Sequence, residues 1–301
     1  MARDLSDRAY KQVFSNPQVL RSFLTDFVPE PWVALVDFSS LRVASAEFPE
    51  ISRGRRTGDL LLELTLADRS RALVFLLLEF QSNPEAMALR LLEYMLRIYR
   101  RQRERSAGKL SVVAPMVIYN GDRPWREDVR FAGSFRVGHE SLRRFIPDFS
   151  YLLVDVKELD EGRLRELGSE VACFFLLDKT DLRQAEAAAR RIGGIFRELV
   201  QGLPAAVRRV LEDYVLELIS LRGERRMLAD SELRTLLYSE RGVGMLAQSI
   251  ERLYEKGRVE GRVEGVQGVA RRMLAEGFSV EEIARATGLP EEKIRALEGR
   301  P

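Results

Sequence analysis

The chain has 301 residues, of which 46% are apolar and 31% are charged. This composition excludes a disordered chain and supplies enough apolar surface for about two domains. The 48 Lys and Arg residues nearly balance 46 Asp and Glu residues, so an anionic partner would need a local basic patch. One Cys (Cys173) and one His (His139) exclude an internal disulfide and metal sites built from several Cys or His side chains. Chemistry in this chain must therefore depend on carboxylates.

The N-terminal residues and the hydropathy pattern predict a cytoplasmic protein. The first ten residues, MARDLSDRAY, carry charges where a secretory signal would have an apolar run. No stretch approaches about 18 uncharged apolar residues, so we expect no membrane span. The single Cys suits a reducing compartment.

The first 160 residues predict a mixed α/β arrangement. Asn16-Pro17 starts a helix, because Pro fits the first helical turn, and Pro29 stops it. The expected elements in chain order are helices within 4–28, an early strand within 33–48, strong strands at 58–66 and 72–81 joined by a polar turn, a helix from Pro84 to about Arg105, and strands at 110–119 and 151–156.

Beyond residue 160 the sequence predicts helices alone. Helical spacing of apolar residues is found in the ranges 163–178, 181–201, 204–222 and 230–240. Gly257, Gly261 and Gly265 follow at intervals of four and share one helical face. The remaining segment, FSVEEIARATGLPEEKIRAL (278–297), predicts two short helices, the first capped by Ser279 and ended by Gly288.

These patterns divide the chain into three parts. Residues 1–160 form an α/β core, residues 161–243 a helical extension packed on that core, and residues 244–301 a glycine-periodic helix with a C-terminal helical hairpin. We expect this last part to serve packing or homo-oligomer formation. The alternative is a helix-turn-helix half that reads DNA bases, against which the final helix begins with acidic residues that repel phosphate.

The two strong strands bring two carboxylates together. An antiparallel hairpin centred on Arg69 pairs residues whose numbers sum to 138, so that Asp59 faces Glu79 and Gln81 lies on the same face. A shift of one residue would separate them. Adjacent carboxylates repel unless a proton or a cation lies between them, and Mg²⁺ binds both carboxylate and phosphate oxygens. The alternative is a pair of solvated or ion-paired acids beside nearby arginines.

Four segments resemble the Rpn family of recombination-promoting nucleases, also called YhgA-like transposases, in the PD-(D/E)XK nuclease superfamily. The segments are YKQVFSNPQVLRSFLTDFVPEPW (10–32), RTGDLLLEL (56–64), VFLLLEFQSNPEAMALRLLEYMLRIY (74–99) and APMVIYNGDRPW (114–125). The resemblance covers about residues 1–160. It implies a restriction-endonuclease-like core, with a mixed central sheet flanked by helices. It also implies a metal-dependent DNA endonuclease that acts in recombination or mobile-element-type DNA transfer.

By position, the resemblance makes Asp59 and Glu79 the metal ligands, with Mg²⁺ as the expected cofactor and Mn²⁺ or Ca²⁺ as alternatives. Gln81 stands where the superfamily has a catalytic Lys, although the Rpn branch itself typically has Gln. A Lys offsets transition-state charge, whereas Gln offers only neutral hydrogen bonds. Asp7 is the candidate for an N-terminal acid that completes the site; alternatively, it is a carboxylate that favours a helix start.

The stretch RIYRRQRERSAGK (97–109) holds six basic residues and one acid. It predicts salt-dependent, sequence-independent DNA binding, with a solvated helix face as the alternative. The expected DNA contacts are Arg90, Arg97, Arg100, Arg101 and Arg103. Because Gln81 replaces Lys, the second hypothesis is a non-catalytic nuclease-like module that binds DNA or a protein. Cys173 is expected in the core and His139 at the surface.

Overall fold

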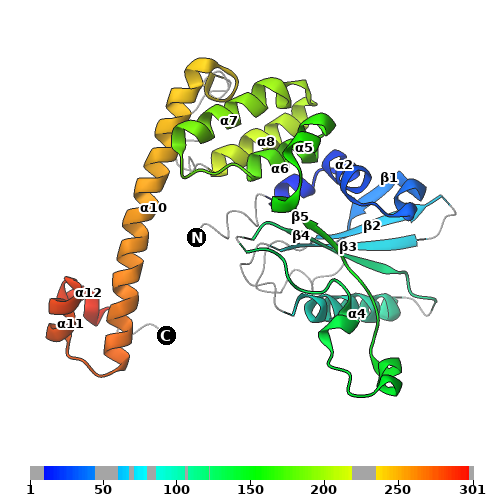
Figure 1. The fold of residues 1–301 in the computed structure, drawn as a ribbon, viewed down its shortest axis with the longest axis horizontal. Helices are drawn as coiled ribbons and strands as arrows, with labels where there is room; N and C mark the ends of the chain where they lie inside the picture. Colours follow the sequence, from blue (N-terminus) through cyan, green and yellow to red (C-terminus); the bar gives the residue numbers. More distant parts are fainter. Residues whose placement is uncertain are drawn as a thin grey trace.

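The computed structural model describes residues 10–44, 60–67, 71–79, 86–105, 108–121, 123–218 and 235–297, with the backbone alone at 71–79, 253–254 and 256–264. A five-stranded sheet forms the centre of the N-terminal part (Figure 1). Its strands are β1 (Val36–Val43), β2 (Leu60–Leu66), β3 (Arg71–Glu79), β4 (Val113–Tyr119) and β5 (Leu152–Asp155). The predicted mixed α/β arrangement is therefore confirmed.

The sheet combines antiparallel and parallel pairs. In the order β1-β2-β3-β4-β5, the first two pairs are antiparallel and the last two are parallel. Parallel neighbours need a crossover connection, and α4 (Met87–Arg105) supplies it between β3 and β4. The early strand predicted within 33–48 is β1, which a short 3₁₀ turn, η1 (Pro31–Leu35), precedes.

The register of β2 and β3 corrects the predicted pairing. Leu60 faces Leu76 and Thr65 faces Arg71, so paired numbers sum to 136 and the hairpin is centred one residue before Arg69. The sequence could not fix this register, because β3 is apolar on both faces and a slip leaves its pattern unchanged. The difference of two residues is even, so each paired position keeps its predicted face.

The two faces of the sheet pack against different helices (Figure 1). Leu60 and Leu62 join the cluster that includes residues of α2 (Pro17–Phe27) and α6 (Glu170–Asp178). Leu61, between them, joins the cluster of α4 on the opposite face. This alternation follows from the two-residue period of a strand. The sheet is thus covered on both sides.

The helical C-terminal part is confirmed, with one correction. The predicted helix 163–178 is two helices, because Gly168 adopts a left-handed conformation (φ 55°) that ends α5 and Ser169 caps α6. The helices are α5 (Glu161–Leu167), α6, α7 (Ala185–Glu198), α8 (Ala205–Leu218), α10 (Glu240–Ala275), α11 (Val280–Thr287) and α12 (Glu291–Arg295). The residues that the structure describes beyond position 160 contain no β-strand.

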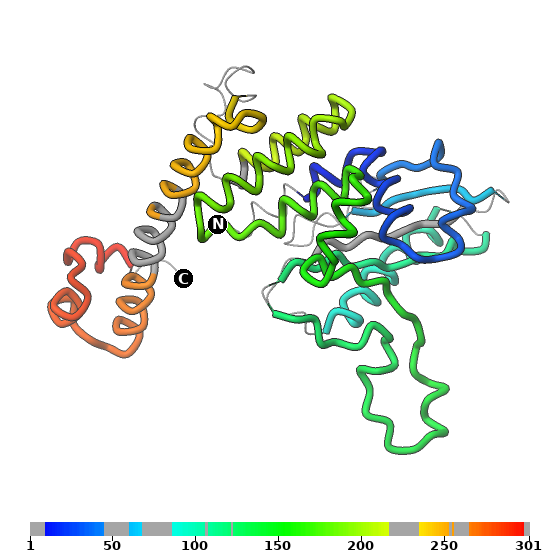
Figure 2. The backbone as a smooth tube through the Cα atoms, turned by 45° about the horizontal axis from the view of Figure 1, so that its top comes forward, coloured from blue at the N-terminus to red at the C-terminus, as the bar shows by residue number. Residues whose placement is uncertain are grey.

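Helix α10 is 36 residues long and leads away from the rest of the molecule (Figures 1 and 2). Its first part packs on α7. Its far end carries α11 and α12 around a small cluster of Ala270, Ile283 and Ile294. The predicted cap at Ser279 and the predicted end at Gly288 are both confirmed.

Local capping confirms other predictions in the N-terminal part. Asn16 caps α2 by accepting a hydrogen bond from the backbone nitrogen of Gln18, and Pro17 occupies the first turn.

Cys173 is fully buried in α6 and His139 is exposed, as expected. None of the helices along the described ranges has the length and hydropathy that a membrane crossing requires.

Candidate functional site

Four strand termini meet at one end of the sheet. Glu79, the last residue of β3, is in register with Tyr119, the last residue of β4, and Tyr119 is in register with Asp155 of β5. Leu60, the first residue of β2, lies opposite Leu76 of β3. Open α/β sheets bind ligands beyond the carboxyl ends of their parallel strands. This end of the sheet is therefore the candidate site.

The structure describes only part of the predicted metal site. Glu79 is placed by its backbone at the end of β3. Asp7, Asp59 and Gln81 lie outside the described residues, although Asp59 directly precedes Leu60 in sequence. Among the side chains that are described, no group of three or more His, Cys, Asp or Glu residues is arranged to hold a metal ion. The meeting of Asp59, Glu79 and Gln81 therefore stays a prediction.

A buried carboxylate that the sequence analysis missed lies beside this end of the sheet. Asp178, at the end of α6, accepts hydrogen bonds from the hydroxyl groups of Tyr10 and Tyr214, each at 2.5 Å. It also accepts one from the side-chain amide of Asn120, the residue directly after β4. Burial raises the pKa of the Asp178 carboxyl to about 6, although the tyrosine hydroxyls and Lys179 act in the opposite direction.

This carboxylate ties four separate segments together. Tyr10 precedes α2, Asn120 follows β4, Asp178 ends α6 and Tyr214 lies in α8. Burial, followed by the negative charge of Asp178, raises the pKa of both tyrosines well above the usual value. The signal in the sequence is a lone acid at the end of the apolar run VACFFLL. Its three partners satisfy it, so it acts as a structural tie at the end of the sheet.

The turn after β4 is fixed in place by aromatic contacts. The hydroxyl of Tyr119 donates a hydrogen bond to the carbonyl of Arg123 at 2.6 Å, and the ring of Trp125 packs edge-on against Tyr119 at 4.8 Å. A Cβ atom at Gly121 would lie 2.1 Å from the Tyr119 hydroxyl, so this close approach requires glycine. These contacts hold the chain that directly follows β4 against Tyr119.

Helix α4 carries the arginines predicted to contact DNA. Arg97, Arg100 and Arg103 are exposed, whereas Arg90 and Arg101 are half-buried. Residues three apart in a helix are neighbours, so the three exposed arginines lie close together. Arg103 donates to the carbonyl of Gly108, and Arg101 pairs with Glu104 at 3.1 Å. This geometry provides a basic helix face; its contact with DNA stays a prediction.

Comparison with known proteins adds independent findings. The family model described as "Putative transposase, YhgA-like" matches residues 5–206. The Inactive recombination-promoting nuclease-like protein RpnE of Escherichia coli (strain K12) is 25% identical over 295 residues, covering 96% of this chain and 95% of RpnE. Recombination-promoting nuclease RpnA of the same strain is 22% identical, covering 96% of each chain. Recombination-promoting nuclease RpnD of Escherichia coli O157:H7 is 27% identical, covering 40% of this chain and 47% of RpnD. No solved structure matches the chain.

Proposed function

The chain belongs to the YhgA-like transposase family, and from this premise we propose that it is a metal-dependent DNA endonuclease. Its biological setting is recombination or mobile-element-type DNA transfer. Two relatives, RpnA and RpnD, are named recombination-promoting nucleases, which supports a nuclease. DNA as the substrate and dependence on a metal are part of this proposal.

A restriction-endonuclease-like core is also part of the proposal. The sheet supports it, because an antiparallel β1-β2-β3 meander continues directly into a parallel β3-α4-β4 unit. Helices cover both faces of this mixed sheet. The carboxyl ends of β3, β4 and β5 are left as the place where a substrate would bind.

The observation that carries the proposal is the register at this end of the sheet. Extending the ladder by one residue beyond the Leu60–Leu76 pair would set Asp59 opposite Leu77, with Glu79 in the diagonal position. Diagonal positions on one face are about 7–8 Å apart. Asp and Glu side chains are long enough for both carboxylates to bind one cation across this distance. Bonds from Mg²⁺ to oxygen are about 2.0–2.1 Å.

The residue types at these positions suit a hard divalent cation. The carboxylates of Asp59 and Glu79 and the amide oxygen of Gln81 are oxygen donors, which Mg²⁺ prefers and which Mn²⁺ and Ca²⁺ also accept. A bound cation would polarise the phosphodiester and activate water. Gln81 would hold water or a phosphate oxygen through neutral hydrogen bonds. Arg90, in the first turn of α4, is the candidate for the positive charge that a lysine would otherwise supply.

A second candidate function is a nuclease-like module that binds DNA or a protein without cutting. Two observations favour it. RpnE, a relative that matches nearly the whole chain, is named inactive. Position 81 is Gln rather than Lys, which removes a charge that would stabilise the transition state.

Plasmid nicking with Mg²⁺ or with EDTA distinguishes the two. We expect the parent to nick only with Mg²⁺. Asp59→Asn and Glu79→Gln should each reduce the rate about 100-fold or more, because a bound ion contributes several kcal/mol to transition-state stabilisation. Arg183→Gln is the matched control, since Arg183 is exposed in the helical part. Acid variants that nick as fast as this control would refute the metal site, and a parent that only binds DNA would support the module.

A further inference from the structure

Between β4 and β5 the chain leaves the sheet and forms a projecting arm, residues 129–151 (Figure 2). It contains two 3₁₀ turns, η3 (Phe131–Ser134) and η4 (Glu140–Phe145). Helix α4 contacts η3, so the arm leaves from the α4 side of the sheet (Figure 1). None of the residues named above in the candidate site belongs to this arm.

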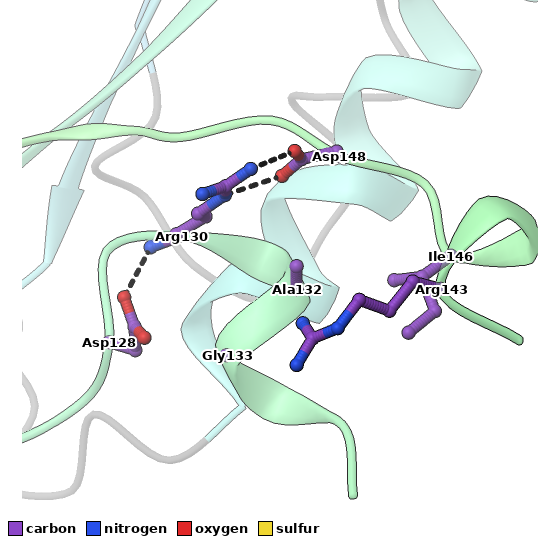
Figure 3. A pocket seen from close by; sticks show the side chains of 7 residues that line it. All are labelled: Asp128, Arg130, Ala132, Gly133, Arg143, Ile146 and Asp148. Atoms are coloured by element: carbon purple, nitrogen blue, oxygen red, sulfur yellow. Dashed lines mark hydrogen bonds and ion pairs between the residues drawn. The ribbon is translucent and has the colours of Figure 1, made fainter. Parts of the chain in front are cut away.

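The base of the arm is braced by several kinds of contact. Phe131 donates its backbone N–H to the carbonyl of Phe149 at 2.9 Å, and their rings stack with centroids 5.3 Å apart. Arg130 makes a two-pronged ion pair with Asp148, which also lines a cavity of about 330 Å³ (Figure 3). Asp128 occupies the space beside Gly133 where a Cβ atom would lie. The arm therefore leaves the sheet from a defined base.

The tip of the arm exposes large apolar side chains. Phe135 is 44% exposed, Leu142 is 52% exposed and Phe145 is 69% exposed. No residue of η4 is buried. Isolated surface apolar residues are common. Phe135 packs edge-on against the buried Phe131 with ring centroids 5.1 Å apart, whereas Leu142 and Phe145 are the exposed apolar side chains of η4.

The same tip is basic. Residues 134–146 contain Arg136, Arg143 and Arg144 against one acid, Glu140. The guanidinium carbon of Arg144 lies 4.8 Å from the centre of the Phe145 ring, and Arg143 pairs with Glu140 at 2.7 Å. All of these side chains are exposed. The partner that matches this surface is anionic and presents an apolar or aromatic face.

We propose that the arm is a DNA-contacting element in which Phe145 inserts as an apolar wedge at a base step of duplex DNA while Arg136, Arg143 and Arg144 contact phosphates. This inference rests on the proposed function, because that function supplies DNA as the substrate. Proteins that bind the minor groove commonly insert Phe or Leu between base steps, with Arg side chains beside them, and so kink the duplex. Phe145 is exposed, and Arg144, whose guanidinium lies over the Phe145 ring, would move from the ring to a phosphate as the ring inserts. The excess of arginine favours duplex DNA over a protein partner.

Duplex binding by the full chain in EDTA tests the arm without cleavage. Fluorescence anisotropy of a labelled duplex of about 30 base pairs, read between about 50 and 200 mM salt, gives the affinity and its salt slope. A duplex with 2-aminopurine at a central step reports unstacking. The variants are Phe145→Ala and the triple change Arg136→Gln, Arg143→Gln and Arg144→Gln. The control is the triple change Arg165→Gln, Arg183→Gln and Arg190→Gln, which removes exposed arginines from the helical part.

We expect different losses from the two arm variants. The arginine triple should reduce the salt slope by about 2 to 3, since each lost phosphate contact changes it by about 0.9. Phe145→Ala should keep the parent's slope, lose the 2-aminopurine signal and bind about tenfold more weakly. The helical triple should match the parent in all three readouts.

The outcomes separate the arm from the proposed function. A parent that binds no duplex in EDTA overturns the arm proposal, whereas the proposed function is decided separately by nicking with Mg²⁺. A parent that binds duplex, with arm variants that match the helical control, overturns the arm proposal alone and indicates a protein partner for the tip of the arm. A Phe145→Ala protein that retains the full 2-aminopurine signal overturns the wedge.

Discussion

At the scale of single residues, Asp178 connects segments that lie far apart along the chain. Its hydrogen-bond partners Tyr10, Asn120 and Tyr214 are 168, 58 and 36 residues away. A carboxylate in such a place is costly when charged and is stabilised by its donors. The balance between burial and hydrogen bonding therefore makes the stability of the fold depend on pH.

The direction of this dependence follows from the pKa of Asp178, which is raised from 3.8 to about 6. The folded chain holds this proton more tightly, so the contribution to stability is full below about pH 4 and is lost as the pH rises through about 6. The whole shift corresponds to about 3 kcal/mol. Asp178→Asn should therefore gain about 2 kcal/mol relative to the parent between about pH 4 and pH 8, measured as the free energy of unfolding in urea.

Asp181→Asn is the matched control for this measurement. Asp181 is exposed, and its hydrogen bond with Arg183 lowers its pKa to about 2. Its stabilising contribution is complete above about pH 4 and is lost only as the pH falls toward 2. The difference in the free energy of unfolding between Asp181→Asn and the parent should therefore stay constant over the same pH range. If Asp178→Asn also gives a constant difference, the carboxyl of Asp178 does not titrate as described.

At the scale of elements, the turn after β4 depends on one glycine. A Cβ atom at Gly121 would lie 2.1 Å from the hydroxyl of Tyr119, a fully buried side chain. Tyr119 can relieve this contact only by leaving its hydrogen bond with Arg123 and its packing against Trp125. Gly121→Ala should therefore destabilise the fold by about 1–3 kcal/mol, measured by thermal unfolding. Gly138→Ala, where a Cβ atom meets nothing, should leave the melting temperature close to that of the parent.

Element boundaries followed from the sequence wherever a local signal sets them. Asn16 with Pro17, Ser279 and Gly288 each act on the adjacent turn, and each was predictable. The β2–β3 register was wrong by two residues, because a run of apolar residues carries no signal that distinguishes one pairing from another. The break between α5 and α6 was missed, since helical periodicity continues through Gly168 although its backbone does not.

The candidate site was less predictable than the elements. The residues of the predicted metal site are near the ends of strands, and the family resemblance selected them. Asp178 was missed, because its partners come from segments that only the folded chain brings together. The arm was missed for a related reason, since Phe145 is exposed only because no element in the described part of the chain packs over it. The spacing of residues along the sequence does not indicate which distant segments pack against each other.

At the scale of the whole molecule, one core joins the sheet to the helical extension. Phe174 and Phe175 of α6 lie at the centre of an aromatic cluster; the ring of Phe174 is 4.5 Å from that of Tyr10, and the ring of Phe175 is 5.1 Å from that of Phe27. Every residue from Val171 to Leu177 is fully buried. A helix that is apolar all round requires neighbours on all sides. The sheet face that carries α2 therefore depends on residues beyond 160.

The distal end of α10 is different, because its small cluster around Ala270 is separate from that core. Two truncations should therefore behave differently. A chain ending near residue 160 would expose the apolar surface that α6 covers, so it should be poorly soluble and melt without cooperativity. A chain lacking residues 257–301 keeps Leu246 and Ile250, which belong to the main core, and should melt cooperatively within a few degrees of the parent. Circular dichroism during heating measures both, and cooperative melting of the 1–160 fragment would show that the α/β part folds alone.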